Sequence, residues 1–148
     1  MIRIDGQEYK EMPSDAVFAE AKDVWLENLQ KVSVLPDMPR AKYVWLRNLS
    51  QVSVLPEMPK ANSVWLENLP QVTELPEMPE AKYVWLRNLS QVSVLPDTPK
   101  ANSVWLDNLS QVSVLPEMPN ATDVWLDNKL KKLFDKSYKK KEDAIKKV

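Results

Sequence analysis

The chain has 148 residues, of which 44% are apolar and 28% charged, with one Gly, twelve Pro and neither Cys nor His. This length suffices for one domain, and the missing residue types exclude disulfides, thiol nucleophiles, imidazole acid-base relays and the usual zinc sites. The formal net charge of −1 combines an acidic body with a basic end, because residues 129–148 contain nine of the 20 basic side chains and three of the 21 acidic ones.

Residues 1–20 are expected to form an N-terminal cap. Ile2–Tyr9 alternates around an Asp-Gly pair, which predicts a β-hairpin, and Ser14–Ala21 has the pattern of a short helical turn. Met1–Asp5 carries charge, and apolar stretches such as Ala16–Ala19 are only four residues long. We therefore expect neither a membrane span nor a cleavable signal peptide.

Residues 21–128 contain six repeats of 20 residues. The triplet Val-Trp-Leu recurs at this period without drift, and residues 41–56 are identical to residues 81–96. The triplets begin at Val24, Val44, Val64, Val84, Val104 and Val124. A fixed short period is typical of a solenoid, in which each repeat stacks on its neighbours and contributes to a continuous core.

Each repeat is predicted to combine one strand with an extended return. In the second repeat the alternation places Val44 and Leu46 on one side of a strand and Trp45 on the other. The Leu55–Pro59 segment contains two prolines three residues apart and cannot be helical. Twenty residues leave no room for a full helix, so we predict a mainly β solenoid of parallel strands with proline-rich returns, in which Val52–Val54 adds a short second strand.

The repeat Ala-x-x-Val-Trp-Leu-x-Asn-Leu-x-x-Val-x-x-Leu-Pro-x-Met-Pro-x resembles a leucine-rich repeat over about residues 21–128. Its Leu-Pro-Glu-Met-Pro segment is similar to the short proline-containing repeats of bacterial effector proteins. The family pattern has Leu where this repeat begins with Ala, and Asn48 comes one place early after Leu46, so another β-solenoid is the competing architecture. The resemblance implies a strand face that binds other proteins. The ubiquitin-ligase activity of some such effectors is not expected, because the chain has no Cys and no second domain.

A column of tryptophans runs through the repeats: Trp25, Trp45, Trp65, Trp85, Trp105 and Trp125. The alternation that buries Val and Leu turns each indole to the outer side of the sheet. At about 4.8 Å per strand, the indoles form a stacked stripe about 24 Å long, which is more apolar surface than monomers normally expose. The reversed register, with Trp inside, conflicts with the charged neighbours of Trp on its own side. We expect the Trp stripe to bind a partner. The alternative is that the stacked indoles serve only to stabilise the sheet.

Two further columns flank the Trp stripe. Two positions after Trp, acidic residues alternate with Arg47 and Arg87, so opposite charges on adjacent strands are expected to pair. Two positions before Trp, Tyr43 and Tyr83 alternate with serines. The Arg and Tyr side chains can also engage a carboxylate or a ring of a ligand. The predicted partner-binding residues are the six tryptophans together with Tyr43, Tyr83, Arg47, Arg87 and Glu67.

The most regular polar column consists of asparagines: Asn28, Asn48, Asn68, Asn88, Asn108 and Asn128. We assign it a structural role on the inner side of the strands, where stacked amides about 4.8 Å apart can bond to one another and to the turning backbone. Because an unpaired buried amide is costly, replacing Asn68 by Leu is expected to lower stability.

Residues 129–148 are predicted to form a basic amphipathic helix that caps the last repeat. Its apolar residues recur at helical spacing: Leu130, Leu133, Phe134, Tyr138, Ile145 and Val148. Such a cap covers an apolar face and a strand edge that would otherwise be open to other chains. We interpret the lysines as the exposed side of this helix. Neither nucleic acid nor a membrane is expected as a partner, because the body of the chain is acidic.

The returns contain an acidic column: Asp37, Glu57, Glu77, Asp97 and Glu117. Calcium loops require several oxygen ligands and tight Gly turns, and the sequence lacks such turns. We therefore predict no metal site and no cofactor, and interpret the column as solvation of the returns.

The sequence favours a non-enzymatic protein-binding scaffold, because its acids, lysines and serines recur in every repeat and no Gly-rich phosphate loop is present. In the first hypothesis a rigid Trp, Tyr and Arg surface recognises a heterologous protein. In the second, two Trp faces pack together in a self-associating structural protein, which can be a consensus or engineered array. In the third, the indoles stack on sugar rings. We expect a cytoplasmic location, or export without a cleavable signal peptide.

Overall fold

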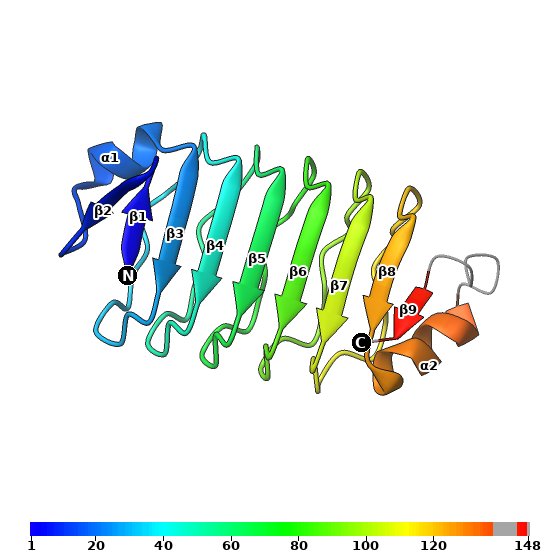
Figure 1. Ribbon diagram of the computed structural model, residues 1–148. Helices are drawn as coiled ribbons and strands as arrows, with labels where there is room; N and C mark the ends of the chain where they lie inside the picture. Colours follow the sequence, from blue (N-terminus) through cyan, green and yellow to red (C-terminus); the bar gives the residue numbers. More distant parts are fainter. Residues whose placement is uncertain (138–144, 148) are drawn as a thin grey trace.

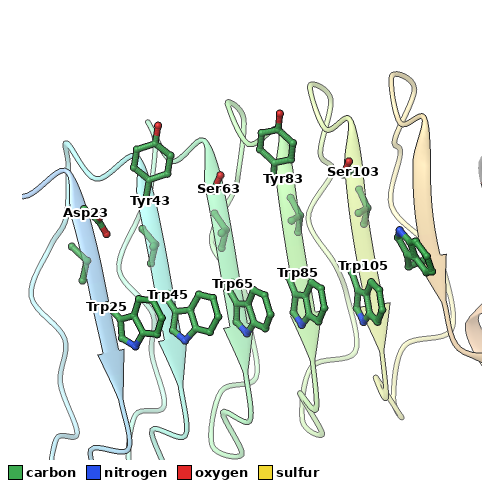
Figure 2. Close-up of a pocket in the computed structure, with 16 residues that line it drawn as sticks. Asp23, Trp25, Tyr43, Trp45, Ser63, Trp65, Tyr83, Trp85, Ser103 and Trp105 are labelled. Atoms are coloured by element: carbon green, nitrogen blue, oxygen red, sulfur yellow. The ribbon is translucent and has the colours of Figure 1, made fainter. Parts of the chain in front are cut away.

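The computed structural model describes residues 1–137 and 145–147, which form a nine-stranded sheet wound as a solenoid (Figure 1). The six strands of the repeats lie side by side, parallel and in register, so that Val pairs with Val and Trp with Trp. These strands are β3 (Asp23–Glu27), β4 (Tyr43–Arg47), β5 (Ser63–Glu67), β6 (Tyr83–Arg87), β7 (Ser103–Asp107) and β8 (Asp123–Leu126). The predicted parallel solenoid is confirmed. The tryptophans lie on its outer side (Figure 2).

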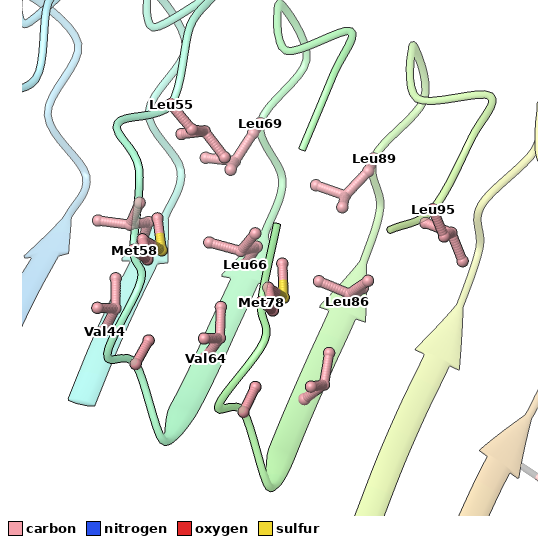
Figure 3. Close-up of a cluster of buried hydrophobic side chains, with 14 of the residues drawn as sticks. Val44, Leu55, Met58, Val64, Leu66, Leu69, Met78, Leu86, Leu89 and Leu95 are labelled. Carbon is pink, nitrogen blue, oxygen red and sulfur yellow. The ribbon is translucent and has the colours of Figure 1, made fainter. Parts of the chain in front are cut away.

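The core lies between the strands and the returns. Val and Leu on the inner side of each strand are buried, as Val64 and Leu66 show with exposed fractions of 2% and 0%. The returns contribute buried side chains such as Met58 and Leu69, which face the strands in Figure 3. Burying each such side chain stabilises the fold by about 1.5–3 kcal/mol relative to exposure, so each turn is held mainly by apolar contacts with its neighbours.

The returns are extended, as predicted, but the short second strand expected at Val52–Val54 is absent. Val52 is buried and Val54 is exposed, so the alternation of a strand is present without its pairing. The physical reason is local. In the equivalent segments, the backbone N–H groups of Val72, Val92 and Val112 donate to carbonyls three residues earlier and thus close turns instead of a ladder.

Thr98 occupies a position at which four other returns place a buried Met, namely Met38, Met58, Met78 and Met118. The Thr98 side chain is only 3% exposed, and its Oγ1 has no hydrogen-bond partner among the described residues. Replacing Thr98 by Met is expected to raise the free energy of unfolding by about 1–2 kcal/mol, because it removes an unpaired hydroxyl and adds buried apolar surface. Urea unfolding measures the change in the free energy of unfolding. Thr98→Ser is the control, and it should be less stable than the parent because it keeps the hydroxyl and loses a buried methyl group. A Met variant no more stable than the parent would contradict this expectation.

The predicted N-terminal hairpin and helical turn are confirmed. Strands β1 (Ile2–Ile4) and β2 (Gln7–Tyr9) are joined at Gly6, whose φ of 82° suits a residue without a side chain. Strand β1 pairs antiparallel with β3 and so covers the edge of the repeat sheet. Helix α1 (Asp15–Glu20) contributes Phe18, which is fully buried at this end of the core.

At the other end, helix α2 (Asn128–Ser137) follows β8 directly. It begins after Asp127, whose Oδ1 accepts the backbone N–H of Leu130 at 2.9 Å and thus caps the helix. Leu130 and Phe134 are buried, as the helical spacing predicted.

The prediction of one helix throughout residues 129–148 is wrong at its end, where Ile145–Lys147 forms strand β9. This strand pairs in parallel with β8. Without it, the backbone donors and acceptors at the edge of β8 would lack partners, so pairing outweighs the helical pattern of the sequence. Tyr138 and Val148, also assigned to the cap helix, lie outside the described residues.

Candidate functional site

The outer side of the sheet carries a continuous stack of six indoles (Figure 2). This stack is the Trp stripe expected from the sequence, and it is called the Trp ladder from here on. Successive ring centroids lie 3.9–5.0 Å apart with interplanar angles of 6–23°. The predicted outward placement of the indoles is therefore confirmed, and each Trp is half-buried by its neighbours. Because the ring faces contact one another, a ligand along the ladder would meet ring edges.

In the five tryptophans labelled in Figure 2, from Trp25 to Trp105, the indole nitrogens point away from the Tyr and Ser column. At the first strand, Trp25 Nε1 donates to Glu27 Oε2 at 3.1 Å. Four further indole nitrogens are buried without a hydrogen-bond partner among the described residues: Trp45, Trp65, Trp85 and Trp105. From Trp25 to Trp105, the side of the ladder that faces the Tyr and Ser column is consequently a carbon edge.

A groove of about 540 Å³ runs across the strands between the Trp ladder and the Tyr and Ser column. Tyr43 and Tyr83 stand 52% and 51% exposed at its border, with Ser63 and Ser103 as the shorter side chains that follow them. Asp23 occupies the same column on the first strand. The groove thus combines an apolar wall with hydroxyl groups on the opposite side, and its border alternates between tall and short residues.

The predicted charge pairing is confirmed as a continuous ladder of ion pairs beside the tryptophans. Arg47 contacts Glu27 at 2.9 Å and Glu67 at 2.5 Å. Arg87 contacts Glu67 at 3.4 Å and Asp107 at 3.1 Å. Glu67, expected to contact a partner, is only 5% exposed and lies between two guanidinium groups. Both arginines remain partly exposed, but neither they nor Glu67 lines the groove, because all three lie on the other side of the Trp ladder.

Arg3 covers the first end of the Trp ladder, which the sequence alone did not indicate. Its guanidinium lies 5.7 Å from the centroid of Trp25. Strand β1 pairs Arg3 directly with Trp25, and Glu8 holds the guanidinium at 3.1 Å. Only the pairing of β1 with β3 could have revealed this contact, because nothing in the local sequence specifies that register.

The asparagines form the expected ladder, but their predicted burial on the inner side of the strands is wrong. Asn48 donates to Asn28 at 2.7 Å, and Asn68 donates to Asn48 at the same distance. The residues from Asn28 to Asn108 in this column have φ of 53–58°, which ends each strand and turns the amide out of the inward alternation. The amides are therefore exposed or half-buried, and Asn128 instead begins α2.

Replacing Asn68 by Leu is still expected to lower stability, by about 1–2 kcal/mol, because Leu tolerates the left-handed conformation poorly. Asn68→Gly is the control, since Gly adopts this conformation without strain and removes only the amide contacts. Urea unfolding of both variants separates the two contributions. A Leu variant no less stable than the Gly variant would contradict the backbone explanation.

The acidic column of the returns is exposed in all five members. Within the described part of the chain, no three acidic side chains gather closely enough to hold a metal ion. Neither helix described here has the length and apolar character needed to cross a bilayer.

Fold and groove together define a class of protein: a parallel β-solenoid of 20-residue repeats whose outer side presents stacked indoles beside an apolar groove. Comparison with protein-family models, curated proteins and solved structures found nothing that matches this chain. Function therefore has to be inferred from the chemistry of the groove.

Proposed function

We propose that this chain is a non-enzymatic scaffold that binds another protein in the groove beside the Trp ladder. The observation that supports this function most directly is a long apolar groove bordered by two half-exposed tyrosines, Tyr43 and Tyr83. Tyrosine and tryptophan give large contact area at low entropic cost and are enriched among residues that dominate binding energy. The resemblance of the repeats to leucine-rich repeats, which bind proteins on their strand face, favours the same function.

The ring geometry favours a protein over a carbohydrate ligand. Sugar rings stack on exposed aromatic faces, whereas the indoles of the Trp ladder stack on one another, with ring centroids 3.9–5.0 Å apart. Trp25, at one end, has Arg3 over its ring. What the ladder offers is a row of edges, which suits the carbonyl oxygens and aliphatic groups of a polypeptide because the edge of an aromatic ring is electropositive.

Self-association is the second candidate function, favoured by one observation. In a two-fold pair with antiparallel solenoid axes, the protruding Tyr43 of one copy would oppose the short Ser103 of the other, and Tyr83 would oppose Ser63. The same arrangement, however, would place Asp23 against Asp123, and opposed like charges disfavour association. We therefore rank a heterologous partner first. We expect the mass measured by light scattering to stay at the mass of one chain as the protein concentration rises.

A selection experiment tests the proposed function. A library of random twelve-residue peptides displayed on phage is selected on the immobilised chain, and the chain is applied in parallel to a glycan array. We expect enriched peptides whose affinity falls about tenfold or more on a Tyr43→Ser/Tyr83→Ser variant, because half-exposed aromatics at the border should dominate the contact.

The matched control is Val54→Ser/Val94→Ser, which removes two exposed apolar side chains from the returns on the other side of the solenoid. This variant should bind the enriched peptides as the parent does. Near-ultraviolet circular dichroism of the stacked indoles confirms that both variants are folded. The proposal would be contradicted if no peptide were enriched, or if both variants lost the same affinity for the enriched peptides. Glycan binding that depends on the tyrosines would also contradict it.

A further inference from the structure

The Trp ladder is a continuous stack of π systems along the repeats. Every neighbouring pair of indoles is stacked, with centroids 3.9–5.0 Å apart and interplanar angles of 6–23°. At the shorter of these distances the ring atoms are in van der Waals contact, so the π orbitals of neighbouring rings overlap. Indole is also one of the side chains that give up an electron most readily. An electron removed from one indole can therefore be replaced from the next, and the electron hole moves along the ladder.

One end of the ladder differs from the rest in what the indole nitrogen contacts. Trp25 Nε1 donates to Glu27 Oε2 at 3.1 Å. Four other indole nitrogens are buried without a hydrogen-bond partner among the described residues, namely Trp45, Trp65, Trp85 and Trp105. A positive charge on an oxidised indole makes its N–H a far stronger acid, but the proton needs an acceptor in contact. Of these five indoles, only Trp25 has one.

The charges around Trp25 favour the loss of that proton. The Arg3 guanidinium lies 5.7 Å from the centroid of Trp25. A neutral ring attracts this cation, whereas a positively charged ring would repel it. Transfer of the proton to Glu27 removes the charge from the ring and leaves a neutral radical. Arg47, which Glu27 contacts at 2.9 Å, keeps its second carboxylate partner, Glu67.

We propose that the Trp ladder is a one-electron redox site, which accepts an oxidising equivalent at any of its indoles and holds it as a neutral radical on Trp25. The reactant is a small one-electron oxidant, which takes an electron from one indole and is thereby reduced. The hole passes between stacked rings until it reaches Trp25, whose Nε1–H bond then breaks and whose proton binds Glu27 Oε2. This activity goes beyond protein binding and requires no occupant in the groove.

Pulse radiolysis of the intact chain tests the inference. The probe is the azide radical, which takes one electron from an indole and becomes the azide ion. The dose is kept low enough that no chain loses more than one electron. The cation radical and the neutral radical of indole absorb at different visible wavelengths, so the loss of the proton is followed in time. We expect the whole cation signal of the parent chain to convert to the neutral radical in a single phase.

Glu27→Gln is the diagnostic variant, because Gln has the same size but accepts a proton far less readily. We expect it to slow the conversion of the whole signal about tenfold or more, the effect of removing a positioned proton acceptor. Asp107→Asn is the matched control. It removes a carboxylate of the same column that is also paired with an arginine, Arg87 at 3.1 Å, whereas the nitrogen of the adjacent Trp105 has no described partner. This control should convert as the parent does.

Trp25→Phe gives a second readout, since it removes the indole that contacts the acceptor and keeps an aromatic ring at the end of the stack. It should slow the conversion of the whole signal as Glu27→Gln does. Near-ultraviolet circular dichroism confirms that the three variants are folded.

The size of the effect separates a shared hole from six independent indoles. If the indoles reacted independently, Glu27→Gln would slow only the radicals formed on Trp25 itself, about one in six. Such a partial effect overturns the inference. Equal slowing by Glu27→Gln and Asp107→Asn, or conversion of Trp25→Phe at the rate of the parent, also overturns it. None of these results changes the prediction that peptides bind in the groove.

Discussion

Replacing Phe18 by Ala is expected to lower the free energy of unfolding by about 3–5 kcal/mol, the usual range for deleting a buried aromatic ring. The Phe18 side chain is fully buried and lies on α1, at the N-terminal end of the core. In a solenoid each repeat contacts only its neighbours, so the first repeat has no preceding repeat to cover its apolar interior. Phe18 supplies part of that cover, and a smaller side chain would leave a cavity.

Val17→Ala is the matched control for Phe18→Ala, because Val17 lies on the same helix and packs only partly against the core. It is expected to cost less than about 1.5 kcal/mol. Urea unfolding followed by far-ultraviolet circular dichroism measures both variants. If the two substitutions cost the same, α1 does not close the core and the assignment of residues 1–20 as a cap is wrong.

Replacing Trp65 by Ala is also expected to lower the free energy of unfolding by about 3–5 kcal/mol. Trp65 stacks on both sides, with centroids 3.9 Å from those of Trp45 and Trp85. Aromatic pairs contribute about 0.5–1.5 kcal/mol each beyond the area that they bury. The substitution removes two such pairs and divides the ladder into two shorter stacks.

Trp25→Ala is the comparison for the interior position, since Trp25 stacks on one indole only and has Arg3 on its other side. We expect it to cost about 1 kcal/mol less than Trp65→Ala, and Trp65→Phe to fall between Trp65→Ala and the parent. Near-ultraviolet circular dichroism should show weaker coupling between indoles after Trp65→Ala. Equal costs for the two positions would mean that stacking contributes little and that burial alone holds the tryptophans.

The architecture of the repeats could be predicted because one pattern recurs six times. The alternation of Val44, Trp45 and Leu46 has a period of two, which assigns opposite sides to Trp and to the aliphatic residues. Charged neighbours of Trp on its own side then decided which side is outward. Opposite charges at Arg47 and Glu67 likewise predicted cross-strand ion pairs, since a constant period brings equivalent positions of adjacent strands together.

The predictions for Asn68 and Ile145 failed because backbone conformation or a distant strand, and not the side-chain periodicity, decided where these residues lie. Asn68 continues the inward pattern by position, but its left-handed backbone ends the strand and exposes the amide. Ile145 continues the helical spacing of the C-terminal segment, yet it joins a strand because β8 offers an unpaired edge. Neither outcome can be read from side-chain periodicity, which is silent about backbone hydrogen bonding.

The candidate site divides in the same way. Its residue types and their order across the strands follow from the 20-residue period, so the tryptophans, Tyr43 and Tyr83 were identified from the sequence. Only the tertiary structure decided that the indole faces are occupied by each other, that Arg3 covers one end of the ladder, and that Glu67 is enclosed between two arginines. Periodicity specifies the side of the sheet on which a residue lies. How much of that residue is left for a ligand depends on contacts between strands, which exist only once the solenoid has formed.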